Sequence, residues 1–217
     1  MKKRITAGEL LAELNADPEF VAARARDDQE RLAYEAEFRR AEAPLVAELR
    51  SAGFQVESAW DLINAPGSYR KALPILLEHL EKPYPSGVRE GIARALGVPD
   101  ASYAWNALTR LYRDEPDHDV KDGLAAAIAG VANDDLIGDV ISLARDPSHG
   151  GSRLLLLSAL EHSPDPRARA ALLALATDPD LTLEVQDIFK RSAKKQARRA
   201  KRAEQVKQAK PSKPAKR

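Results

Sequence analysis

Four short stretches decide the fold of this chain: VREGIARALG at 88–97, VKDGLAAAIAG at 120–130, SRLLLLSALE at 152–161 and EVQDIFKRSA at 184–193. They begin at a constant spacing of 32 residues, and residues 68–196 align with themselves four times at that offset without a gap. A fixed period of this size is typical of a repeat array, in which each unit buries its apolar faces against its neighbours.

Each unit is predicted to hold two helices. The quoted stretches form the second helix, and the first lies within 69–82, 102–114, 134–146 and 167–178, where apolar residues recur at helical spacing, as at Leu73, Leu76 and Leu80. Pro, Asp, Ser and Gly fill the turns between the two helices. Three columns of the alignment predict the core: Leu76, Leu108, Val140 and Leu172; Ile92, Leu124, Leu156 and Ile188; and Ala95, Ala127 and Ala159.

The second helices resemble those of HEAT repeats, in particular the short HEAT-like class of phycobilin lyases. The resemblance rests on Val88-Arg89 opening the helix, on Leu96-Gly97 closing it and on an Asp in the turn before each of the other three second helices. It covers about 130 of the 217 residues. It implies an all-α, right-handed α-solenoid. It implies little about function, because one repeat fold serves many functions.

The resemblance also implies a hydrogen-bonded ladder between units, because an arginine fork matches a carboxylate well. Its donors would be Arg89, Lys121 and Arg153, and its acceptors Asp114, Asp146 and Asp178. Lys82 and Val185 depart from this pattern at the two ends, which suggests terminal units. A tetratricopeptide array is the alternative, since Trp105, Leu108 and Tyr112 match its first helix, but the other units do not repeat Trp105 and the period is 32.

Residues 1–67 are predicted to be a helical N-terminal region. Thr6 with Glu9 predicts a capped helix over 7–15, and Asp17-Pro18 predicts the start of a long charged helix over 18–42. We expect a mostly solvated helix with one thin apolar stripe on the body; a coiled-coil or partner-binding arm is the alternative. Pro44 should bend or restart the helix, and Gly53 should end it.

Residues 54–64 are expected to cover the open end of the array, since terminal repeats need such a cover. Ser58 is a candidate cap for a short helix, and Trp60 is expected to be buried within the cover rather than to stack on a ligand.

Composition limits the classes of protein that remain. A chain of 217 residues with 44% hydrophobic residues is long enough for one packed domain with appendages. No cysteine is present, which excludes disulfides and thiolate metal sites and fits a cytoplasmic location. We predict no signal peptide and no membrane-spanning helix.

No catalytic or cofactor motif emerges, and neither a cofactor nor a bound metal is expected. His118 and His149 occupy equivalent turns and, with nearby aspartates, are a conceivable divalent-metal edge, but exposed turn residues are the simpler interpretation. Lyase or DNA-glycosylase activity would rest on the family resemblance alone, so we predict a protein that is not an enzyme.

Charge is divided unevenly along the chain. Thirteen of the 34 Lys and Arg residues, but one of the 33 acidic residues, lie in 190–217, which leaves 21 basic and 32 acidic residues in the rest. Residues 197–217 are predicted to be a basic, largely disordered tail, with a first part, to about Ala209, able to extend the last helix. Three roles are open: solubilisation by pairing with the acidic body, attachment to nucleic acid or ribosomes, and binding to an anionic membrane.

The leading hypothesis is a protein-binding scaffold or adaptor that uses the face of the second helices. Its predicted contacts are Glu90, Arg94, Asp122, Glu161 and Gln186. The expected partner is another protein, with basic patches that complement the acidic body. The first alternative is attachment to nucleic acid or ribosomes through the tail residues Lys194, Lys195, Arg198, Arg199, Lys201 and Arg202. The second is a toxin-neutralising binder.

Overall fold

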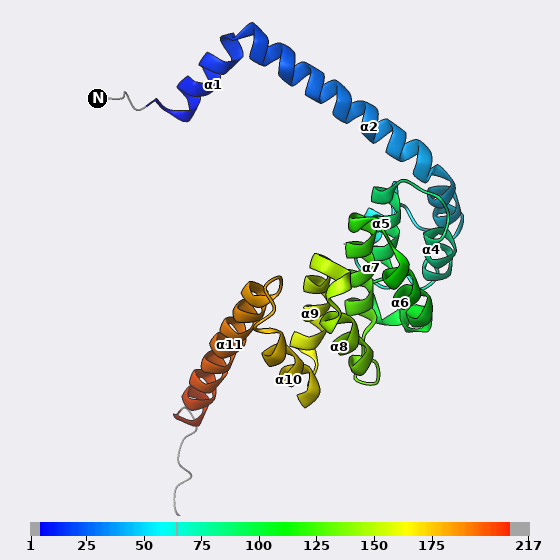
Figure 1. Cartoon of the computed structure of the whole chain (residues 1–217). Coiled ribbons are helices and arrows are strands. Elements are labelled where there is room, and N and C mark those ends of the chain that lie inside the picture. Colours follow the sequence, from blue (N-terminus) through cyan, green and yellow to red (C-terminus); the bar gives the residue numbers. More distant parts are fainter. Residues whose placement is uncertain (1–4, 64, 209–217) are drawn as a thin grey trace, which may run out of the picture. The chain divides into compact units, whose positions relative to one another are not determined.

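The structure, a computed structural model, describes residues 5–63 and 65–208, with side chains as far as Arg202. Throughout these residues the regular structure is helical. Within those residues the chain has helices α1 to α11, two 3₁₀ segments and no strand (Figure 1). The chain divides into two compact units, the first ending at Ile92 and the second beginning at Ala93. Each unit is described by itself.

The first unit opens with two helices whose capping follows the sequence signals. In α1 (Ala7–Ala16) the Thr6 and Glu9 side chains each accept the backbone N–H of the other residue, which confirms the capping box. In α2 (Pro18–Ser51) the Asp17 side chain caps the first turn. Gly53, with φ of +97°, ends α2 as predicted, because this left-handed conformation costs a glycine little.

Two details of α2 differ from the predictions. The helix continues through Pro44 and does not restart there. Leu45 and Leu49, next to this proline, are fully buried, so their packing offsets the hydrogen bond that proline cannot make. The expected thin stripe is only partly present: Phe38 is half-buried with its ring beside Gly87, whereas Val21 and Leu32 are 46% and 57% exposed.

The remainder of the first unit packs around the C-terminal half of α2. Buried Glu42 accepts hydrogen bonds from the Ser58 hydroxyl (3.1 Å) and the Ala59 N–H (2.7 Å), and thereby holds the loop before α3 (Trp60–Ile63). Helix α4 (Leu73–Leu80) contacts α2 and buries Leu73 and Leu76.

Trp60 connects α3 to α5 (Ser86–Ala95). Its indole N–H donates to the Gly87 carbonyl (3.2 Å), and its ring lies where a Cβ at Gly91 would be. The side chain is 37% exposed, so the expectation of a buried tryptophan is only partly met. Its position on α5 agrees with a covering role.

The second unit contains three helix pairs separated by short turns. They are α6 (Trp105–Asp114) with α7 (His118–Val131), α8 (Ile137–Arg145) with α9 (Arg153–His162), and α10 (Pro166–Leu175) with α11 (Thr182–Gln208). The 3₁₀ segments η1 (Pro99–Ala104) and η2 (Pro147–Ser152) precede α6 and α9. Helix α7 packs on α6 and α9, and α9 packs on α8 and α10 (Figure 1).

The repeat columns form the core, as the sequence predicted. The eight residues of the two leucine-rich columns are all buried, each at most 3% exposed. Small residues allow the second helices to approach one another: a Cβ at Gly130 would collide with the backbone of Gly97. Ala95 and Ala127 are fully buried, whereas Ala159 is half-exposed.

One rung of the predicted ladder is present in the second unit. The Arg153 guanidinium donates to Asp178 (2.7 Å) and Asp180 (3.0 Å), and its side chain is 1% exposed. The Lys121–Asp146 rung does not form in the described structure. Lys121 instead donates to the Glu115 carbonyl (3.3 Å), and Asp146 caps η2.

Two further predictions concern the first rung of the ladder and the basic tail. Arg89 donates to the Leu80 carbonyl, and its pairing with Asp114, which would join the two units, stays a prediction. Helix α11 extends to Gln208, which agrees with the expectation that the first part of the tail, to about Ala209, can extend the last helix. The predicted disorder beyond Pro211 lies outside the described residues.

Candidate binding groove on the face of α7, α9 and α11

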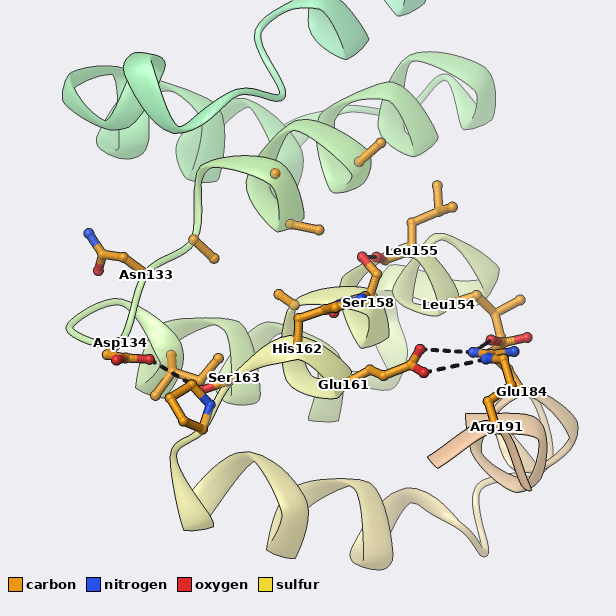
Figure 2. Close-up of a pocket in the computed structure, with 17 residues that line it drawn as sticks. Asn133, Asp134, Leu154, Leu155, Ser158, Glu161, His162, Ser163, Glu184 and Arg191 are labelled. Carbon is orange, nitrogen blue, oxygen red and sulfur yellow. Dashed lines mark hydrogen bonds and ion pairs between the residues drawn. The ribbon is translucent and has the colours of Figure 1, made fainter. Parts of the chain in front are cut away.

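A groove of about 700 Å³ lies along the second helices of the second unit (Figure 2). Helix α9 forms its centre, the C-terminal end of α7 and the following loop form one side, and α11 forms an end. It is lined by Ala126, Ala129, Gly130, Ala132, Asn133, Asp134, Ile137, Leu154, Leu155, Ser158, Ala159, Glu161, His162, Ser163, Pro164, Glu184 and Arg191.

Small residues create this space. Ala126, Ala129 and Gly130 present almost no side chain on the α7 side, and Ala159 lies on α9. Leu154, 37% exposed, and half-exposed Leu155 supply the larger apolar surface. A concave surface with an apolar floor and a few polar groups is typical of a ligand or peptide site.

One end of the groove is closed by a charged cluster. The Arg191 guanidinium donates to both oxygens of Glu161 (Nε–Oε1 3.3 Å, Nη2–Oε2 2.9 Å) and to Glu184 (2.9 Å), as Figure 2 shows. The hydrogen bond from Arg191 lowers the pKa of Glu161, and the two carboxylates raise the pKa of Arg191. Because the Arg191 side chain is 51% exposed, solvent screens these ion pairs and they contribute little to the stability of the fold.

Arg191 occupies a position that is alanine in each of the preceding 32-residue repeats. It lies 32 residues after Ala159, which itself follows Ala127 and Ala95 at the same interval. In those repeats the position faces a neighbouring helix or the groove, so a small side chain is required. The last helix has room for an arginine there, and that arginine reaches back to α9.

The other end of the groove is neutral to acidic. The Ser163 hydroxyl approaches Asp134 (3.5 Å), and Asn133 caps the turn that leads into α8. The His162 ring nitrogen Nδ1 lies 2.7 Å from the Ser158 carbonyl. Glu161 lies between the apolar floor and Arg191, and both of its oxygens accept hydrogen bonds from that arginine.

Of the five predicted protein-binding residues, one lines the groove. Glu161 lines the groove, whereas Asp122 and Gln186 do not, and Glu90 and Arg94 fall in different units. Asp122 lies 3.7 Å from His118, and its buried Oδ1 has no hydrogen-bond partner among the described residues. Leu154, Leu155 and Arg191 are the groove residues that the sequence did not single out.

The predicted tail contacts lie together on the last helix. Lys194, Lys195, Arg198, Arg199 and Arg202 line one shallow depression on α11 with Arg191, and Lys201 is on the same helix.

The two turn histidines differ in burial. His118 is exposed, but His149 is buried beside the Tyr112 ring (centroids 4.6 Å apart), and burial lowers its pKa. The expectation of a solvated His149 is wrong.

Among the residues that the structure describes, no three His, Asp or Glu side chains are arranged to hold a metal ion. No helix in this part of the chain is both long and apolar enough to cross a membrane. The chain matches no family model, no curated protein and no solved structure. The groove and the basic helix therefore have to be interpreted from their own chemistry.

Proposed function

We propose that this chain is a non-catalytic scaffold or adaptor that binds a segment of another protein in the groove on α7, α9 and α11. The observation that carries the proposal is the combination of an apolar floor with carboxylates at one end. Leu154 and Leu155 offer apolar contact, and the two carboxylates of Glu161 and Glu184 outnumber the single guanidinium of Arg191, which leaves a net negative charge in this cluster. A short amphipathic segment with a basic residue beside apolar ones is complementary to both features.

The proposed architecture is a right-handed, HEAT-like solenoid. Its support is the 32-residue period together with the order of packing, in which each second helix contacts the first helix of its own pair and α7 contacts the next second helix, α9. Arg153–Asp178 links successive pairs in the manner that the HEAT resemblance implies. In such an array the second helices form one continuous face, and the groove lies on it.

The size of the groove limits how much of a partner it holds. A volume of about 700 Å³ is within the range of small-ligand and peptide sites rather than of whole-domain interfaces. Truncating a central apolar contact in such a site costs about 2 kcal/mol or more, whereas contacts at the rim cost little. Leu154 and Leu155 are therefore the groove residues expected to dominate affinity.

A photocrosslinking amino acid placed at Leu154 of the full chain tests the proposal. The matched control position is Leu173, which is 57% exposed on α10 and does not line the groove. We expect a protein to be crosslinked from position 154 but not from position 173. The purified partner should then bind the Leu155→Asp variant at least about tenfold more weakly, and the Leu173→Asp variant unchanged. Equal crosslinking at both positions, or full affinity of Leu155→Asp, would refute it.

A further inference from the structure

The cations of α11 lie on one side of the helix. At 3.6 residues per turn, the basic residues from 191 to 202 fall within about half of its circumference. They are Arg191, Lys194, Lys195, Arg198, Arg199, Lys201 and Arg202. Acidic residues are absent from the sequence between Asp187 and Glu204, so this charge is uninterrupted over three turns. We call the five positions 194, 195, 198, 199 and 202 the basic face.

The opposite side of the same helix is small and uncharged. Ala193, Gln196, Ala197 and Ala200 occupy it, and all four are exposed. A helix that inserts into a membrane surface needs large apolar residues opposite its charges. Alanine and glutamine do not supply them, so the charge separation on α11 is unsuited to lipid insertion.

The basic face is not neutralised within the second unit. The acidic residues near the start of α11 are used upstream of it, since Asp187 pairs with Lys190 (2.8 Å) and Glu161 and Glu184 pair with Arg191. In the part of the chain that the structure describes, no carboxylate forms an ion pair with any of the five residues of the basic face. Five mutually repelling cations on one side of a helix favour binding to a polyanion.

We propose that the basic face of α11 binds the phosphates of double-stranded DNA, with the helix lying along the major groove. The basic face from Lys194 to Arg202 extends about 12 Å along the helix axis. The major groove is about 12 Å wide, which is enough to admit one helix across its width. Lys194 and Arg199 point about 140° apart around the helix axis, so they reach phosphates on opposite walls of the groove. The alanine side remains in solvent.

The proposed geometry also predicts which nucleic acids the basic face binds more weakly than double-stranded DNA. The major groove of A-form RNA is too deep and narrow for a helix, so double-stranded RNA should bind more weakly. The basic face contains no aromatic residue on which unpaired bases could stack, so a single strand gains nothing beyond its charge. Binding is expected to tolerate changes of DNA sequence, because the contacts are made to phosphates.

Fluorescence anisotropy of a mixed-sequence DNA duplex with the full chain, across about 50 to 200 mM salt, gives the first test. Contacts to about five phosphates predict a slope of log K against log salt of about −4.5, which is a loss of about 500-fold over this range. Replacing four residues of the basic face by glutamine should remove about 3.6 from the slope. The variant is K194Q/K195Q/R198Q/R199Q.

The matched control removes the same four charges from an exposed helix elsewhere in the chain. It is R24Q/R26Q/R39Q/R40Q, on α2. We expect its slope and affinity to equal those of the unmodified chain. An equal loss in the control and the basic-face variant would show that overall charge is responsible, and would overturn the proposal.

A rearranged helix separates an ordered surface from a merely basic segment. Exchanging neighbours moves three cations to the alanine side without changing composition or net charge. The variant is A193K/K194A/K195Q/Q196K/R199A/A200R. We expect about tenfold weaker binding or more, because the moved cations no longer reach the duplex. Unchanged affinity would overturn the proposal, and so would equal binding of double-stranded RNA or of anionic phosphatidylserine vesicles. Circular dichroism checks that α11 remains helical.

Discussion

Replacing Arg153 by methionine should destabilise the second unit by about 2 to 3 kcal/mol. Its guanidinium is almost completely buried and donates from Nη1 to Asp178 (2.7 Å) and from Nε to the Gly150 carbonyl (2.9 Å). Methionine retains the apolar stem but makes none of these bonds. Losing a hydrogen bond to a charged group costs about 1.5 to 3 kcal/mol. The half-buried Gly150 carbonyl keeps a donor, the backbone N–H of residue 153, so its loss of the Nε donor adds little. Asp180 is 58% exposed and adds little.

Arg167 is a matched control for this substitution. It pairs with Asp165 at the same distance, 2.7 Å, but its side chain is 65% exposed. Arg167→Met should therefore destabilise the chain much less than Arg153→Met. Burial, rather than the presence of an Arg–Asp pair, is thus the variable that the comparison isolates.

Urea unfolding followed by Trp105 fluorescence measures both variants. Trp105 is the tryptophan of the second unit and is 7% exposed. A Trp60→Phe background removes the signal of the first unit. A loss below about 1 kcal/mol for Arg153→Met, or equal losses for the two variants, would refute the reasoning that the buried rung holds α9 to the turn before α11.

The same pair makes a statement about pH. The hydrogen bond from Arg153 lowers the pKa of Asp178 below its usual value in the folded chain. The stabilisation is therefore present above the pKa of the unfolded chain and is lost as the pH falls through the lower, folded value. Arg153→Met should remove this part of the acid sensitivity, which a urea series repeated below neutral pH would detect.

Three further substitutions test other parts of the fold by urea unfolding. Gly130→Ala should cost about 1 to 3 kcal/mol, because its Cβ collides with the backbone of Gly97, whereas Gly138→Ala, with its nearest neighbour 3.9 Å away, should be neutral or stabilising. Equal effects would contradict the proposed close approach. Leu156→Ala should cost about 2 to 5 kcal/mol and Leu154→Ala much less, since the first is fully buried and the second is 37% exposed. Burial raises the pKa of Glu42, so the first unit should lose stability as the pH rises through that raised pKa; Glu42→Gln should abolish the loss, and an unchanged pH profile would count against it.

The period of 32 made the helices and core of the second unit predictable. Leu108, Leu124, Val140 and Leu156 recur at fixed spacing, and each is buried in the structure. The capping signals at Thr6 and Asp17 were equally informative, because a cap acts through neighbours within three residues. Repeated features can be detected by aligning the chain with itself, and local features can be detected from a few neighbouring residues.

The groove was harder to predict because it depends on distant residues. The spacing from Ala159 to Arg191 marks the one break in the alanine column, and this signal was available. That Arg191 reaches Glu161 and Glu184 was not, because the direction of a long side chain depends on packing. His149 was misassigned for a similar reason: Gly150, with φ of +60°, turns the chain within η2, and His149 packs against Tyr112.

The N-terminal part of α2 has a dynamic consequence. Residues 18–33, ahead of the segment whose Tyr34 and Phe38 lie beside Gly87, span about 24 Å of helix without one buried side chain, so their backbone hydrogen bonds depend on local helix stability and the cap at Asp17. Amide hydrogens there should exchange with solvent through local fraying, whereas those near Leu45 and Leu49 should exchange only when the unit opens. Proteases that cleave after arginine should accordingly cut at Arg24 or Arg31 long before the core of either unit is degraded.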